Sequence, residues 1–205
     1  MGRQALKNGD YATARKEFLP PANQGDAPAQ LYLGAIYDGG LGVPQDYKEA
    51  VRWYRLPAEQ GQTAAQVLLG DMYDHGHGVS RDCKEAFRWY RLAADRGNAS
   101  AQSNLGFAYE KGQAVPRDFE EAVRWYRSAA EQGDAAAQFN LGVAYHEGRG
   151  VPQDYIQAHM WFNLAGAGGD ADGIKGRDLV AAEMAPDQIA EAQRRAREWK
   201  PKTGR

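Results

Sequence analysis

Two histidines in one short loop are the residues best suited to metal chemistry. His75 and His77 flank Gly76, with Asp74 and Asp82 close by in the sequence. Zinc sites combine His nitrogens with cysteine or carboxylate ligands in a tetrahedral arrangement. Two histidines across a glycine, without supporting cysteine ligands, fall short of that pattern. The sequence therefore predicts no metal site, and no motif for another cofactor accompanies it.

The sequence also gives no support to catalysis by a nucleophile. No Ser, Cys or Lys stands in a nucleophile motif. His159 takes a position that holds Val123 one period of 36 residues earlier, which predicts a packed histidine and not a base. The Gly-x-Gly-Val segments lie between two predicted helices, so they serve as turns and not as phosphate-binding loops. The sequence thus favours a protein without enzymatic activity.

A stripe of arginines could suggest phosphate binding. Three arginines of the stripe are each followed by an acid four residues later, and such i,i+4 pairs form salt bridges along one face of a helix. The arginines are therefore expected to pair within the chain. The formal net charge of −2 also gives no support to a nucleic-acid partner. The predicted pairs are Arg55–Glu59, Arg91–Asp95 and Arg127–Glu131.

The elements that carry these residues repeat with a fixed period of 36 residues. Such a period indicates stacked supersecondary units. The residues that return are Gln30, Gln66, Gln102 and Gln138; Gly34, Gly70, Gly106 and Gly142; Tyr37, Tyr73, Tyr109 and Tyr145; Trp53, Trp89, Trp125 and Trp161; and Gly61, Gly97, Gly133 and Gly169.

Each period predicts a first helix, here called helix A, then a loop and a second helix, helix B. Gly34 lies inside helix A at a cost of about 1 kcal/mol against Ala. Its return in every repeat implies that another helix approaches closely there. Helix A is expected to stop at Gly40 and its equivalents. Asp46 and its equivalents should cap helix B, with Glu49 completing a capping box.

The predicted organisation has four parts. Residues 1–25 form an incomplete repeat, 26–169 four full repeats, 170–200 a pair of capping helices, and 201–205 a frayed tail. The two capping helices, about 171–183 and 186–199, should close the end of the stack.

Composition leaves the compartment open. A single cysteine, Cys83, excludes an intrachain disulfide, and no apolar run approaches the roughly 20 residues of a membrane helix. No signal peptide follows Met1. Because the first repeat is incomplete, we expect either a longer native N-terminus that could include an export signal or an end that docks on another molecule. Periplasmic, secreted and cytoplasmic locations are all compatible with the sequence, and oligomeric state is not indicated.

The repeated motif resembles the Sel-one-like repeat (SLR) family, relatives of the tetratricopeptide repeats. The motif reads Ala-x-Ala-Gln-x-x-Leu-Gly-x-x-Tyr, then Gly-x-Gly-Val-x-x-Asp, then Ala-x-x-Trp-Tyr-x-x-Ala-Ala-x-x-Gly. The resemblance covers about Asp10 to Gly169. It implies an all-α fold, a right-handed α/α superhelical solenoid with the A helices on the concave side. Ala114 replaces the loop glycine, so the third loop should differ in conformation.

The resemblance places a binding groove on helix A. Positions there that point away from the packed stripe differ between repeats, which marks them as free of packing constraints. A peptide or helix of another protein is the expected partner. The predicted groove residues are Tyr32, Asp38, Leu68, Asp71, Asn104, Phe107, Phe139, Asn140 and Val143.

Three functions follow as hypotheses. The first is a protein–protein interaction adaptor without catalysis. The second, suggested by the resemblance, is a hydrolase acting on cell-wall or β-lactam-like ligands, which would need Ser, Lys or Glu facing the groove. The third is a purely structural or engineered repeat array.

Overall fold

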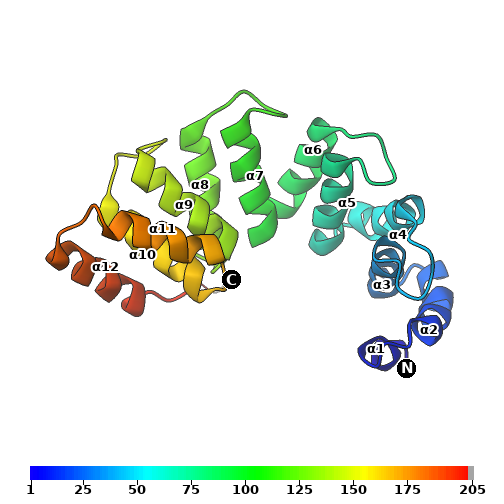
Figure 1. Cartoon of the computed structure of the whole chain (residues 1–205). Helices are drawn as coiled ribbons and strands as arrows, with labels where there is room; N and C mark the ends of the chain where they lie inside the picture. The colour runs from blue at the N-terminus through cyan, green and yellow to red at the C-terminus, as the bar shows by residue number, and fades with distance from the viewer. Residues whose placement is uncertain (203–205) are drawn as a thin grey trace. The chain divides into compact units, whose positions relative to one another are not determined.

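The computed structural model describes residues 1–202, and within that range every regular element is an α-helix. Figure 1 shows the helices in chain order. The all-α repeat architecture predicted from the sequence is confirmed. The helices are α1 (Gly2–Lys7), α2 (Tyr11–Asn23), α3 (Ala27–Asp38), α4 (Tyr47–Glu59), α5 (Thr63–His75), α6 (Cys83–Ala94), α7 (Ala99–Lys111), α8 (Phe119–Ala130), α9 (Ala135–Glu147), α10 (Tyr155–Ala167), α11 (Ala171–Ala181) and α12 (Pro186–Glu198).

The chain divides into two compact units, Met1–Arg96 and Gly97–Arg205. In the first unit α1 to α6 pack in sequence, each helix on the next. In the second unit α7 to α10 do the same. The A helices are α3, α5, α7 and α9, and the B helices are α4, α6, α8 and α10.

Close approach between helix A and helix B explains the glycine inside helix A. A Cβ added to Gly142 would lie 2.7 Å from the Phe162 ring, and one added to Gly34 would lie 2.3 Å from the Tyr54 ring. Real Cβ atoms do not approach carbon that closely. The predicted close approach is confirmed, because an aromatic ring of helix B occupies the space that a side chain would need.

A buried glutamine ties each of three A helices to the preceding B helix. The side-chain amides of Gln30, Gln66 and Gln138 donate to the carbonyls of Ala22, Ala58 and Ala130 at 3.0, 3.1 and 3.2 Å. Each of these carbonyls also accepts a backbone N–H from the glycine three residues later, at Gly25, Gly61 and Gly133. The repeated glutamine therefore adds a second, buried hydrogen bond at the junction of two repeats.

The B helices begin as predicted, but without the reciprocal half of the capping box. The Asp46 carboxylate accepts from the backbone of Lys48 and Glu49, at 3.0 and 3.1 Å. The backbone N–H of Asp46 donates instead to the Tyr37 carbonyl at 2.9 Å, and Glu49 pairs with Arg52. The N–H that Glu49 was expected to bind is therefore already occupied.

The A helices end as predicted in three of the four repeats. Gly76, with φ +71°, ends α5 in the left-handed conformation, as do the corresponding glycines of α7 and α9. The first repeat differs, because α3 has its C-cap at Gly39 in a right-handed conformation. Ala114 does not adopt the positive φ of Gly78 and Gly150, so the third loop does differ in conformation.

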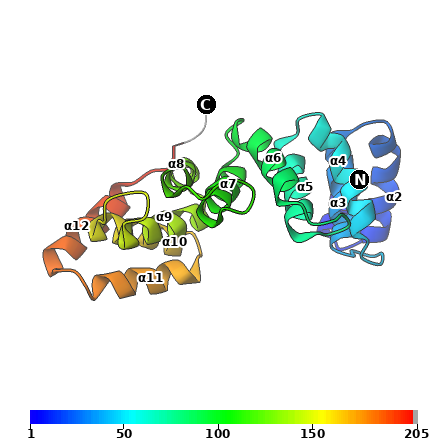
Figure 2. The same ribbon diagram turned by 90° about the horizontal axis from the view of Figure 1, so that it is seen from above.

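The last two helices both pack on α10, and Figures 1 and 2 show them beside it. α11 also contacts α9, and Ala196 and Trp199 at the end of α12 join the core of the second unit. The tail was expected to fray, yet the Lys202 backbone donates to the Glu131 carbonyl at 2.7 Å. The rest of the predicted tail, 203–205, lies outside the described residues.

Candidate functional site

Tyrosine–acid hydrogen bonds organise the exposed side of helix A in three repeats. In each, a helix B tyrosine donates its hydroxyl to a carboxylate on helix A of the same repeat. The tyrosine ring is the one that covers the helix A glycine. The pairs are Tyr54–Asp38 at 3.3 Å, Tyr90–Asp71 at 2.7 Å and Tyr126–Glu110 at 2.9 Å.

Burial controls the electrostatics of these pairs. It raises the pKa of Tyr126 well above its usual range, and the neighbouring Glu110 charge raises it further. Tyr54 and Tyr90 have pKa values raised for the same reasons. Burial also raises the pKa of Asp71, against the opposing effect of its hydrogen bond from Tyr90. The tyrosines therefore remain protonated donors at physiological pH.

The fourth repeat lacks this pair. Phe162 stands at the tyrosine position, His146 stands at the position of Asp38 and Glu110, and Val143 stands at the position of Asp71, one helical turn earlier. The His146 Nε2 lies 3.2 Å from Glu183, and its ring lies 5.7 Å from the ring of Tyr155. Hydrogen bonds from His146 and then from Tyr155 lower the pKa of Glu183. The side chain at this position thus contacts the α11–α12 junction instead of helix B.

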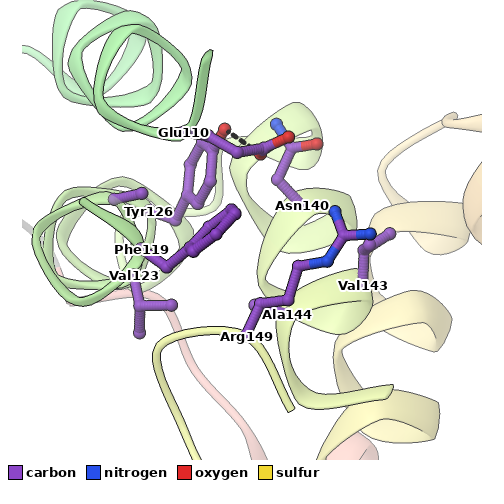
Figure 3. Close-up of a pocket in the computed structure, with 9 residues that line it drawn as sticks. Glu110, Phe119, Val123, Tyr126, Asn140, Val143, Ala144 and Arg149 are labelled. Atoms are coloured by element: carbon purple, nitrogen blue, oxygen red, sulfur yellow. Dashed lines mark hydrogen bonds between the residues drawn. The ribbon is translucent and has the colours of Figure 1, made fainter. Parts of the chain in front are cut away.

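A small hollow of about 20 Å³ lies between α7, α8 and α9 (Figure 3), and we call it the α8–α9 hollow. Its apolar wall comes from Phe119, Val123 and Val143, and the Tyr126–Glu110 pair closes one side. The amide of Asn140 and the guanidinium of Arg149 also line it, and Figure 3 shows them across from Tyr126 and Phe119. The hollow combines an apolar wall with a few polar groups, a pattern typical of ligand sites.

A second, wider hollow of about 420 Å³ lies between α9, α10 and α11, and we call it the α9–α11 hollow. Phe139, Val143, Phe162 and Leu179 provide its apolar surface. Leu179 is 56% exposed, so its side chain is open to solvent at the edge of the hollow. Val143 lines both hollows, so a single helix, α9, contributes to both.

In the first unit, the predicted groove residues are engaged within the protein. Tyr32 stacks on Phe18, with ring centroids 4.7 Å apart, and Leu68 packs against the core. Asp38 and Asp71 accept the tyrosine hydroxyls described above. These four side chains therefore have structural contacts of their own.

In the second unit, the predicted residues gather on two helices. Phe139, Asn140 and Val143 line the hollows on α9. On α7, Asn104 is partly buried, and Phe107 is 43% exposed. Phe107 holds the most exposed aromatic ring of the predicted set.

Several lining residues were not predicted, and two of them, Arg149 and Leu179, lie outside helices A and B. Arg149 comes from a loop position that differs in every repeat, and its guanidinium lies 5.8 Å from the Phe119 ring. Leu179 comes from α11, where the 36-residue period has already failed. A comparison of repeats could not have found either one, although an apolar side chain on the polar side of a short helix was a usable signal for Leu179.

The other candidate sites have simpler explanations. His159 is 2% exposed and burial lowers its pKa, so it is a packed histidine as predicted. His77 stacks on Tyr47 with ring centroids 4.4 Å apart. Residues 1–202 hold no cluster of three or more His, Cys, Asp or Glu side chains suited to a metal ion.

Of the three predicted arginine–acid pairs at i,i+4, one forms. Arg91 binds Asp95 at 2.9 Å. Arg55 and Arg127 instead donate to the hydroxyls of Tyr73 and Tyr145, each at 2.8 Å. These tyrosines lie on helix A of the following repeat, so the arginines connect neighbouring repeats.

The sequence profile of the Sel1 repeat matches four consecutive segments, residues 27–62, 63–98, 99–134 and 135–170. Together they cover well over half of the chain. The chain belongs to the Sel1 repeat family. The resemblance noted from the sequence is thereby confirmed.

Solved Sel1 repeat structures share this fold. One is a Sel1 repeat protein from Oxalobacter formigenes, with 31% identity and a TM-score of 0.79, covering 97% of this chain and 84% of that one. Another is a protective antigen of uropathogenic Escherichia coli with an SLR fold, with 32% identity and a TM-score of 0.62. That match covers 92% of this chain and 48% of the antigen, so this chain spans about half of the antigen's length.

A Sel1 repeat protein described from Klebsiella pneumoniae matches at 21% identity with a TM-score of 0.56, over 88% of this chain and 89% of that one, which bears on the fold alone. No curated protein gives a significant match. Within residues 1–202, none of the helices has the length and apolar character needed to cross a membrane.

Proposed function

We propose that this Sel1 repeat protein is a non-catalytic interaction scaffold. Its binding face is formed by α7 and α9 of the second unit, and its ligand is a segment of another protein. The observation that carries the proposal is the position of Val143, which lines two hollows at once. Two adjacent hollows on one helix suit two apolar side chains from a single extended peptide.

Polar groups at the face support an extended peptide. The Asn140 amide offers both a donor and an acceptor at the α8–α9 hollow, which suits the backbone of such a peptide. The exposed Phe107 ring on α7 adds apolar surface, and apolar and aromatic anchors contribute most of the affinity at protein interfaces.

Charge adds little selectivity here. Glu110 accepts the Tyr126 hydroxyl, Glu147 pairs with Arg149 at 2.8 Å, and Asp172 pairs with Lys175 at 2.8 Å. Because these rim charges are paired within the chain, we expect the bound segment to be recognised by apolar side chains and backbone hydrogen bonds.

The hydrolase alternative ranks second. Its best candidates for a general base, Asp71 and Glu110, each accept a tyrosine hydroxyl, and Ser103 is 8% exposed. A spacer without a ligand ranks below both, since it leaves the exposed Phe107 and Leu179 without a role.

The test compares proteins captured from the native host by crosslinking and quantitative mass spectrometry. The variant carries Phe107→Ala, Asn140→Ala and Val143→Ala, and the matched control carries Arg124→Ala on the outer side of α8. We expect specific captured proteins to fall about tenfold with the triple variant, a loss of about 1.4 kcal/mol, and to persist with the control. Retention of every captured protein by a folded triple variant would contradict the proposal.

A further inference from the structure

The end of the chain fills a groove between two B helices of the second unit. Trp199 meets Trp161 edge-on, with ring centroids 6.3 Å apart. Its ring lies 4.0 Å from the place of a Cβ on Gly133. The Lys202 ammonium binds Glu131 at 2.8 Å, in addition to the backbone bond to the same residue. This groove between α8 and α10 thus accepts the end of an amphipathic helix.

The same groove exists two repeats earlier, in the first unit. There a hollow of about 400 Å³ lies between α4 and α6, and we call it the α4–α6 groove. Five of its lining residues are repeat equivalents of residues that contact Trp199 or Lys202, or that belong to the core cluster of Trp199, in the second unit. The equivalent positions are Ala58 and Ala130, Glu59 and Glu131, Gly61 and Gly133, Trp89 and Trp161, and Leu92 and Leu164.

The two grooves share their frame. Arg55 donates to Tyr73 in the first unit as Arg127 donates to Tyr145 in the second, both at 2.8 Å. They differ in how far the leucine three residues after the tryptophan is covered. Leu92 is 40% exposed in the first unit, whereas Leu164 packs in the cluster that contains Trp199.

The grooves also differ in charge at two positions. Arg88 and Arg96 line the α4–α6 groove where the second unit has Met160 and Gly168. Arg88 lies over the Trp89 ring, 4.1 Å from its centroid, and pairs with Glu85 at its edge. Arg96 directs one N–H to the Gly61 carbonyl. A guanidinium carries five N–H donors, so Arg96 retains donors for a carboxylate.

We propose that the α4–α6 groove docks the end of an amphipathic helix from another protein, with an aromatic side chain against the exposed Leu92, beside the Arg88 guanidinium that covers Trp89, and flanking carboxylates on Arg88 and Arg96. The filled groove of the second unit supplies the mode of docking, and the two arginines supply the charge selection. This surface is separate from the α7 and α9 face, so the proposal does not depend on the proposed function.

Charge argues against a second copy of this chain as the occupant. The end of α12 and the residues after it are net basic, because five cations outnumber the carboxylates of Glu191 and Glu198. The cations are Arg194, Arg195, Arg197, Lys200 and Lys202. These cations would meet Arg88 and Arg96, and like charges placed together at an interface oppose binding. The neutral Met160 and Gly168 of the second unit impose no such penalty on the chain's own end.

The test uses two fluorescent peptides of residues 186–202 and the full-length protein. One peptide has the natural sequence, and the acidic probe carries Arg197→Glu and Lys200→Glu, which place carboxylates on both sides of Trp199. We expect the wild-type protein to bind the acidic probe at least about tenfold more tightly than the natural peptide, measured by fluorescence anisotropy.

A variant with Arg88→Met and Arg96→Gly copies the second unit's lining into the first. We expect it to lose the preference for the acidic probe by about tenfold or more, while the control Arg124→Met keeps it. Both replaced arginines are exposed, and circular dichroism checks that the fold is retained.

Three outcomes would overturn the proposal. The first is no binding of the acidic probe by the wild-type protein. The second is unchanged preference in the Arg88→Met, Arg96→Gly variant. The third is a dimer in analytical ultracentrifugation that dissociates on these two substitutions, which would make a second copy the occupant.

Discussion

The Tyr126 hydroxyl donates to the Glu110 carboxylate at 2.9 Å, from helix B to helix A of one repeat. The corresponding bonds of Tyr54 and Tyr90 repeat this relationship in the first unit. In the fourth repeat the hydroxyl and the acid are lost together, at Phe162 and His146. The paired loss indicates that the helix A acid serves the tyrosine and thereby fixes the distance between the two helices.

Removal of this hydroxyl should weaken the second unit. Tyr126→Phe removes the donor to one oxygen of the partly buried Glu110 carboxylate, whose other oxygen keeps the Lys111 ammonium at 2.9 Å. We expect a loss of about 1 kcal/mol in the free energy of unfolding, measured by urea denaturation. Tyr126→Phe combined with Glu110→Gln should cost less than Tyr126→Phe alone, because a neutral amide is less costly than a carboxylate to leave without the hydroxyl donor. A larger loss in the double variant would show that Glu110 has another role.

The glycine inside helix A should not tolerate a methyl group. Gly142→Ala would place a Cβ 2.7 Å from the Phe162 ring. We expect it to cost about 1–3 kcal/mol through overpacking, although Ala is the better helix former by about 1 kcal/mol.

The clash can be relieved to test this explanation. In a Phe162→Ala background the ring is absent, and Gly142→Ala should become neutral or stabilising in the same urea titration. Equal cost in both backgrounds would mean that the ring is not the reason for the glycine.

Asp71 should make stability depend on pH. Because burial raises its pKa, the folded protein binds the proton more tightly than the unfolded chain, whose Asp pKa is about 3.9. The penalty for ionised Asp71 is therefore absent below that value and is complete once pH exceeds the folded pKa. We expect Asp71→Asn to raise the Tm at pH 7 and to lose this gain towards pH 4.

Calorimetry at several pH values measures this effect. Asp178→Asn, an exposed carboxylate on α11, controls for the change in net charge. A lower Tm for Asp71→Asn at pH 7 would show that the bond from Tyr90 requires the negative charge, in contradiction to the dominant effect of burial.

Trp199 should stabilise the second unit selectively. Trp199→Ala removes a partly buried ring from Trp161 and Gly133, and we expect a loss of about 2–4 kcal/mol, near the lower range for Trp→Ala in cores. Hydrogen exchange should increase in α8, α10 and α12. Exchange in α3 and α4 should not change, because each repeat depends mainly on its neighbours. Uniform acceleration across the chain would contradict this.

Much of the fold could be predicted because its determinants are local or repeat with the period. The Asp46 cap and the stop at Gly76 depend on a few adjacent residues, and the recurrence of Gly34 revealed the aromatic ring that covers it. Glu49 does not form the reciprocal hydrogen bond, because its expected donor, the backbone N–H of Asp46, binds the Tyr37 carbonyl across the loop. A pattern within one helix could not indicate that competitor.

The candidate site was less accessible from sequence. Helical spacing correctly placed Asn140 and Val143 on the face of α9 that lines a hollow. The same spacing treated Asp71 as available to a ligand, whereas the hydroxyl of a helix B tyrosine binds it. The groove filled by Trp199 was missed, although one signal was present. Met160 interrupts a series of arginines at the place where α12 packs, and an apolar residue in a charged series indicates a covered surface.

That exchange of arginine for Met160 has an evolutionary consequence. A gene duplication that copied the unit 135–170 would leave the apolar stripe of one copy without its covering helix, and so create a liability for aggregation. Duplication of an earlier unit, with its arginines directed to solvent, carries no such penalty. Arrays with this C-terminal arrangement should therefore gain or lose length upstream of the final unit, while the final unit and α12 are inherited together.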